Sequence, residues 1–151
     1  MNHDRFFFFR SAYLESDLFI GVRHNSFRKD MIRFVEDELR RLRKIIEEYS
    51  ARDPRFRTSL EPLPGDGRAA PEIETLLRCA EATRTGPMSA VAGLFADRVG
   101  HMLIREFGLD EVVVENGGDL FIHSCADLTT LIHAGSSSLS DRVALIITPG
   151  S

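Results

Sequence analysis

The sequence predicts an α+β fold in which antiparallel strand pairs carry helices packed on one face. Two β-prone runs, Arg5 to Tyr13 and Asp17 to Arg23, are separated by three residues, which indicates an antiparallel hairpin. Segments with apolar residues at three- and four-residue steps follow and indicate amphipathic helices. A second pair of short apolar runs, joined by Asn116-Gly117-Gly118-Asp119, indicates another hairpin.

The first of these runs contains four consecutive phenylalanines, Phe6 to Phe9. A run without polar alternation is typical of a strand that is covered on both faces. At the edge of a sheet, without cover, such a strand would be an aggregation hazard. We therefore expect the two hairpins to belong to one sheet or to two packed sheets.

Three helices are predicted between the hairpins. The first follows His24-Asn25-Ser26, which we interpret as its N-cap, and buries one face between Phe27 and Tyr49. The second runs from Pro71 to Arg84. The third begins near Met88, directly after Gly86-Pro87, because proline suits the first turn of a helix.

The rest of the chain is less regular. Residues 52–71 hold four of the six prolines and are predicted as an irregular loop within the domain. Past the second hairpin, two further strands are predicted over Leu128–Ala134 and Asp141–Thr148. We expect residues 1–151 to form a single domain that is incomplete at its C-terminal end. The final strand should then pair with further chain, or with a second copy in a homo-oligomer.

Composition excludes several classes of partner. A net charge of −4 gives no basis for nucleic-acid binding. No segment approaches the roughly 20 apolar residues that cross a membrane, and the run at Phe6 is too short for a signal-peptide core. Two cysteines, Cys79 and Cys125, are too few for a disulfide framework and are expected in a helix and a strand. We therefore expect a cytoplasmic protein with no nucleic-acid and no membrane partner.

One stripe of the third helix carries almost no side chain: Ser89, Gly93, Ala96 and Gly100. Two interior glycines each cost roughly 0.5 to 1 kcal/mol relative to alanine, so something is expected to approach this backbone closely. Tight packing on the sheet and a ligand lying on the stripe both remain open. Asp97 stands one turn beyond Gly93, where its carboxylate would be solvated or bound to a partner.

The turn between the last two apolar runs also offers polar groups. Asn-Gly is a strong hairpin signal because both residues tolerate a positive φ. Two consecutive glycines, Gly117 and Gly118, exceed what a hairpin needs and would let exposed N–H groups and Asp119 meet a polar ligand. Further along, His123, Cys125 and His133 match no recognised zinc spacing, so we predict no metal site there.

Taken together, the G-x-x-x-D step from Gly93 to Asp97 and the turn from Asn116 to Asp119 resemble those of ApbE-type FAD:protein FMN transferases. The opening from Gly86 to Gly93 is more similar to an uncharacterised family related to them. The resemblance implies a T-fold-like α+β architecture and a bound flavin nucleotide, FAD or FMN. It implies that the nucleotide is held by Ser89, Gly93, Asp97, Asn116, Gly117, Gly118 and Asp119.

Two departures from the transferases bear on activity. Transferases usually carry a lysine just before the G-x-x-x-D glycine, where this chain has Ala92. Their metal site also draws on a C-terminal D-x-x-x-T motif, which this sequence does not contain. We therefore expect Mg²⁺ only if such a segment is supplied, expect no FMN transfer, and assign no catalytic residue. The alternative is a non-catalytic structural or protein-interaction domain in which the glycines serve packing.

Overall fold

Two antiparallel sheets and four α-helices make up the part of the chain that the computed structural model describes, residues 5–65 and 67–150. The predicted α+β class is confirmed. The elements in chain order are β1 (Phe6–Tyr13), β2 (Ser16–Arg23), the 3₁₀ turn η1 (His24–Ser26), α1 (Asp30–Arg52), α2 (Arg55–Thr58), α3 (Pro71–Thr83), the 3₁₀ turn η2 (Pro87–Ala90), α4 (Val91–Phe107), β3 (Val112–Asn116), β4 (Asp119–His123), β5 (Leu128–Leu131) and β6 (Ala144–Ile147).

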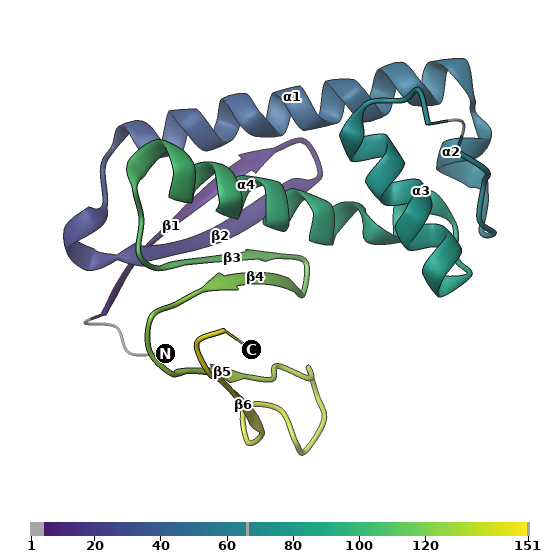
Figure 1. The fold of residues 1–151 in the computed structure, drawn as a ribbon. Helices are drawn as coiled ribbons and strands as arrows, with labels where there is room; N and C mark the ends of the chain where they lie inside the picture. Colours follow the sequence, from purple (N-terminus) through teal and green to yellow (C-terminus); the bar gives the residue numbers. More distant parts are fainter. Residues whose placement is uncertain (1–4, 66, 151) are drawn as a thin grey trace.

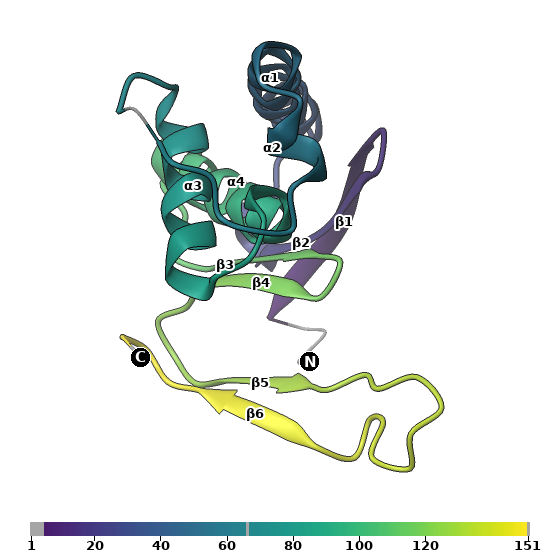
Figure 2. The same cartoon turned by 90° about the vertical axis from the view of Figure 1, so that its right-hand side faces the viewer.

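The larger sheet has the order β1-β2-β3-β4, with every neighbouring pair antiparallel. Both predicted hairpins therefore lie in one sheet, as expected. Helices α1 and α4 cover one face of this sheet, and α3 packs against them beyond its end (Figure 1). Strands β5 and β6 form a separate hairpin on the opposite side of the sheet (Figure 2).

The four phenylalanines of β1 are covered on both faces, which confirms the prediction from their sequence. Phe7 and Phe9 point toward the helices, where the Phe7 ring stacks on Phe27 with centroids 3.9 Å apart. Phe6 and Phe8 point to the other face and pack in a second cluster with Leu128 of β5. The root of the small hairpin therefore forms part of the cover that β1 needs.

The core between the helices and the larger sheet is apolar and fully buried. Helix α1 buries the face that its periodicity predicts, and α4 adds a second set of apolar side chains. The buried apolar side chains of these two helices are Met31, Val35, Leu39, Leu42, Ile46, Leu94, Phe95, Ala96, Val99 and Leu103.

The start of α1 and the proline-rich loop differ from the sequence-based expectations. The segment His24–Ser26 forms a 3₁₀ turn rather than an N-cap, and α1 begins at Asp30 without a side-chain capping bond. Within residues 52–71, the short helix α2 breaks the predicted irregular loop. It forms because Phe56 is fully buried, with its ring 4.9 Å from that of Tyr49.

The C-terminal strands are shorter than predicted. Strand β5 ends at Leu131 and β6 begins at Ala144. The pairing becomes irregular here because the carbonyl of Ile132 accepts from the N–H of Asp141, a residue with a φ of 58°. Cys125 lies in the link between β4 and β5, not in a strand as predicted.

The small-residue stripe of α4 divides into two parts. At Gly100 the ring of Phe121 in β4 lies so close that an added Cβ would stand 2.1 Å from its Cδ1 atom. Tight packing on the sheet therefore explains this glycine. At Gly93 the nearest atom to an added Cβ would be Oδ1 of Asp119, at an ordinary 3.5 Å.

The two glycines should respond oppositely to alanine. We expect Gly100→Ala to lower the free energy of unfolding by about 1 to 3 kcal/mol, because its methyl group would displace the Phe121 ring. Gly93→Ala should cost nothing, and should add up to about 1 kcal/mol through helix propensity. Urea unfolding followed by circular dichroism measures both. Equal losses at the two positions would contradict this division of the stripe.

Candidate functional site

The predicted site residues meet where the first turns of α4 pass over the turn between β3 and β4. Asp119, the first residue of β4, faces the bare backbone of Gly93. Within residues 5–65 and 67–150, no group hydrogen-bonds the Asp119 carboxylate. The side chain is exposed, so the carboxylate is available to a ligand that lies on this part of α4.

Asn116 joins the turn to the helix. Its buried side-chain amide donates a hydrogen bond from Nδ2 to the carbonyl of Ala92, 3.0 Å away. That carbonyl belongs to the residue just before Gly93, so the bond fixes β3 against α4 at the point where Asp119 faces the helix. Asn116 therefore positions the site.

The two glycines of the turn adopt backbone angles that favour glycine. Gly117 has a φ of 62° and Gly118 a φ of 103°. The N–H of Gly118 donates to Oε1 of Glu115 at 2.7 Å. Both glycines are exposed, so a polar ligand could reach this backbone from solvent.

Ser89 and Asp97 lie one turn to either side of Gly93 on α4 and its 3₁₀ extension. The Ser89 hydroxyl donates to the carbonyl of Gly86 at 2.8 Å and lies 2.7 Å from the hydroxyl of Thr85. Oδ1 of Asp97 lies 3.2 Å from Nδ1 of His101. The structure thus brings Gly93 and Asp119 together, while Ser89 and Asp97 extend the same helix surface and already have neighbours.

A hollow of about 430 Å³ opens beside the turn. Asn116 and Gly117 form one wall, and the half-exposed ring of Phe19 and the Arg10 guanidinium line it from β2 and β1. Phe19 stacks on Phe8 on the face of the sheet away from α4, and Arg10 is paired there with Asp17. This hollow is therefore separate from the contact between Asp119 and Gly93. The sequence patterns gave no indication of Phe19 or Arg10.

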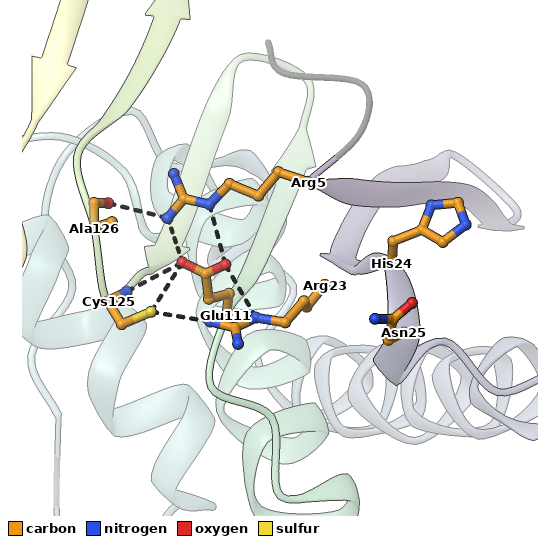
Figure 3. A pocket seen from close by; sticks show the side chains of 7 residues that line it. All are labelled: Arg5, Arg23, His24, Asn25, Glu111, Cys125 and Ala126. Carbon is orange, nitrogen blue, oxygen red and sulfur yellow. Dashed lines mark hydrogen bonds and ion pairs between the residues drawn. The ribbon is translucent and has the colours of Figure 1, made fainter.

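A second constellation, also missed by the sequence analysis, surrounds Glu111 at the opposite end of β3 (Figure 3). The side chain of Glu111 is only 2% exposed. Arg5 binds it with two nitrogens, one of them Nε at 3.1 Å from Oε2. Ser124 and Cys125 donate to Oε1 at 3.1 to 3.3 Å, and Nε of Arg23 approaches Oε2 at 3.4 Å.

These bonds determine the charge of the buried group. The Arg5 guanidinium above all, and then Cys125 and Ser124, lower the pKa of Glu111 to about 2 against the desolvation that burial imposes. The same bond raises the pKa of Arg5. Glu111 is therefore ionised wherever the protein is folded at ordinary pH.

A hollow of about 500 Å³ opens next to this network. It is lined by Arg5, Arg23, His24, Asn25, Glu111, Cys125 and Ala126. Glu111 forms an ion pair with Arg5. Arg23 lies between two carboxylates, with Nε 3.4 Å from Oε2 of Glu111 and Nη1 3.9 Å from Oδ2 of Asp110. Both arginines are thus paired with carboxylates, and we interpret this Glu111 network as structural.

The Glu111 network joins distant parts of the chain. Arg5 precedes β1, Glu111 precedes β3, and Ser124 and Cys125 belong to the link that leads into β5. Arg5 also donates to the carbonyl of Asp127 at 2.8 Å. No local sequence signal predicts a pair 106 residues apart, although an acidic residue just before an apolar strand is a weak hint.

Residues 5–65 and 67–150 contain neither a cluster suited to a metal ion nor a helix suited to span a membrane. There, no three His, Cys, Asp or Glu side chains gather in a way that could hold a metal ion. Among the helices found in those ranges, none is both long and apolar enough to span a bilayer.

The fold and the candidate site together define an α+β domain in which a small-residue helix faces a glycine turn. The chain belongs to the family described as AbpE bacteria, whose family model matches residues 1–151. Membership of an ApbE-like family, predicted from the motifs, is thereby confirmed.

The chain is also similar to UPF0280 proteins. It is 36% identical to that of Methanoregula boonei, over 71% of this chain and 44% of the relative. It is 40% identical to that of Methanothrix thermoacetophila, over 69% and 44%, and 32% identical to that of Methanococcus maripaludis strain C5, over 92% and 54%. The chain thus spans about half the length of the curated relatives that it matches.

Removing the Glu111 charge should weaken the fold in a pH-dependent way. Because the pKa of Glu111 falls from 4.5 to about 2 on folding, its contribution is complete above about pH 5 and is lost as the pH falls toward 2. We expect Glu111→Gln to lower the free energy of unfolding by about 3 kcal/mol at pH 7, and by progressively less below pH 4.5.

Denaturant unfolding at a series of pH values measures this difference. Glu81→Gln, which removes an exposed carboxylate from α3, is the matched control and should change little at any pH. A Glu111→Gln deficit that stays constant between pH 7 and pH 2.5 would show that the lost stability is not electrostatic.

Proposed function

We propose that this chain binds a flavin nucleotide, FAD or FMN, where α4 passes over the turn between β3 and β4. The observation that carries the proposal is the Asp119 carboxylate, which faces the bare backbone of Gly93 and hydrogen-bonds no group in residues 5–65 and 67–150. Packing does not require a glycine at position 93, because an added Cβ would meet the Asp119 carboxylate at an ordinary 3.5 Å. The position of the carboxylate suits a ligand that donates hydrogen bonds and needs close approach to the helix.

The chemistry of a nucleotide matches these groups. An ionised carboxylate only accepts hydrogen bonds, and ribose hydroxyls and ring N–H groups donate them. We assign that role to Asp119 and, one helical turn beyond Gly93, to Asp97. Gly93 permits close contact, and the exposed backbone of Gly117 and Gly118 can meet polar atoms of the ligand.

The surrounding bonds support the proposal by holding the site in place. The Asn116 amide ties β3 to the Ala92 carbonyl, and the Ser89 hydroxyl is held by Gly86 and Thr85. A site whose backbone is fixed before binding loses less conformational entropy when the ligand arrives. The motif resemblance to flavin transferases is our reason for proposing a flavin as the nucleotide.

We do not extend the proposal to FMN transfer by this chain. Mg²⁺ takes a nearly octahedral set of oxygen ligands, usually carboxylates together with substrate phosphates. Asp97 and Asp119, once engaged with the nucleotide, cannot also supply that set. A tightly held Mg²⁺ is expected only when a further segment contributes ligands.

The packing of Gly100 on Phe121 favours a second candidate, a structural or interaction domain without a ligand. In that case nothing would lie against Gly93, and the Asp119 carboxylate would be an ordinary solvated group. The two candidates differ in what the Asp119 side chain does, so a binding measurement separates them.

Replacing Asp119 should weaken nucleotide binding without harming the fold. We expect Asp119→Ala to cost about 1 to 3 kcal/mol of binding free energy for FAD or FMN, the range for losing a charged hydrogen-bond partner. Its melting temperature should barely change, because the carboxylate bonds to no described residue. Fluorescence titration of purified protein with each flavin, with and without Mg²⁺, measures the affinity.

Two further variants complete this test. Asp110→Ala removes an exposed carboxylate at the other end of β3 and should leave flavin affinity unchanged. Gly93→Val should abolish binding, because its side chain would fill the approach to the helix. If the unmodified chain binds neither flavin, or if Asp119→Ala and Asp110→Ala bind equally well, the ligand-free alternative is correct.

A further inference from the structure

The β5–β6 hairpin is unusually apolar for a surface element. Of the ten large apolar side chains that are exposed in the described residues, six lie between residues 131 and 146. They are Leu131, Ile132, Leu139, Val143, Leu145 and Ile146, the last of which is 70% exposed. A two-stranded hairpin is at best marginally stable by itself in water, and an apolar surface of this kind usually marks an interaction site.

The free edge of β6 lacks the usual protection. Exposed edge strands normally carry a charge, a proline or a bulge that blocks pairing with another chain, but β6 is Ala-Leu-Ile-Ile. The N–H of Ile132 donates to the carbonyl of Val143, so residue 143 faces β5. Because this direction alternates along an antiparallel strand, Ile146 directs its N–H and C=O to the open edge.

The neighbouring sheet is also only partly covered on the side that faces the hairpin. Leu128 of β5 packs on Phe6 and Val113 at the root of the hairpin. Further from this root, Phe19 is 39% exposed and Leu120 is 43% exposed. Figure 2 shows the hairpin extending beneath the sheet as a second layer of only two strands.

Leu145 indicates where more strands would fit. It is paired with Thr130, and this face of the hairpin also holds Leu128, which packs on the larger sheet. Thr130 and Leu128 are buried, but Leu145 is 53% exposed although it shares their face. On this face of the hairpin, the side chains of β5 are therefore buried, whereas Leu145 of β6, next to the free edge, is exposed.

We propose that the free edge of β6 is a docking site for one or more β-strands that complete this second layer. The occupant is the portion of the UPF0280 relatives that lies outside the match to this chain. An added strand would bond to the outward groups of Ile146 and shield Leu145, as in other cases of strand addition. This docking does not depend on flavin binding.

The length of the relatives argues for that occupant over a second copy. The chain accounts for 54% of the Methanococcus maripaludis relative, which it matches over 92% of its own residues. Those relatives thus contain about as much polypeptide again, and an apolar surface on the shared half is a place where that polypeptide can pack. Within the described residues, the β5–β6 hairpin and the adjoining sheet face offer the largest uncovered group of apolar side chains.

The test is to mix this full chain with the unmatched portion of the Methanococcus maripaludis relative and to measure association by calorimetry and light scattering. We expect a one-to-one complex. Ile146→Pro, which removes the outward N–H but no bond to β5, should weaken it at least tenfold. Ile146→Thr keeps the N–H and the branched side chain and should weaken it less than threefold.

Further measurements make the result decisive. Cross-strand NMR contacts between Thr129 and Ile146 or its replacement should persist in both variants, which shows that β6 still pairs with β5. The relative's own matched portion serves as the positive control for binding. The proposal is overturned if that control binds and this chain does not, if Ile146→Pro binds as tightly as Ile146→Thr, or if the chain alone forms a dimer that Ile146→Pro abolishes.

Discussion

The buried charge of Glu111 is the constraint on which the arrangement of the strands depends. An ionised carboxylate out of contact with water is costly unless every oxygen is matched, so its partners cannot be displaced cheaply. Those partners come from the segment before β1, from the end of β2 and from the link into β5. The network therefore fixes three strand ends together and holds the root of the β5–β6 hairpin against the sheet.

Strand β3 is anchored at both of its ends. Glu111 directly precedes the strand and is held by Arg5, and Asn116, the last residue of the strand, binds the α4 backbone. Between them, Val112 and Val114 are buried beneath α4. The turn that follows is therefore held against the helix, although its glycines are exposed. A backbone that is fixed before a ligand arrives loses less conformational entropy on binding.

Local patterns predicted much of this fold because the interactions behind them are local. Helical periodicity identified the buried face of α1, and Asn-Gly identified the turn after β3. The Arg5–Glu111 pair was missed because its members are 106 residues apart and the position of Glu111 before an apolar strand is only a weak hint. The turn of helix at Phe56 was missed because burial of one ring outweighed a proline-rich composition. The small residues of α4 predicted that another group lies close to the helix backbone. This is correct at Gly100, where the group is the ring of Phe121, which the sequence did not identify, whereas the nearest atom at Gly93 stands at an ordinary distance.

The register of β4 determines which glycine of α4 is filled by packing and which one belongs to the candidate site. Asp119 and Phe121 are two residues apart and share the face toward the helix, so one strand supplies a carboxylate to Gly93 and a ring to Gly100. A shift of one residue would turn Leu120 and Ile122 toward α4 and move both polar and aromatic groups to the other face. Pairing of Asn116 with Asp119 across the turn, with both glycines at positive φ, prevents that shift. The glycines of the turn therefore shape the candidate site even if a ligand touches only the residues that flank them.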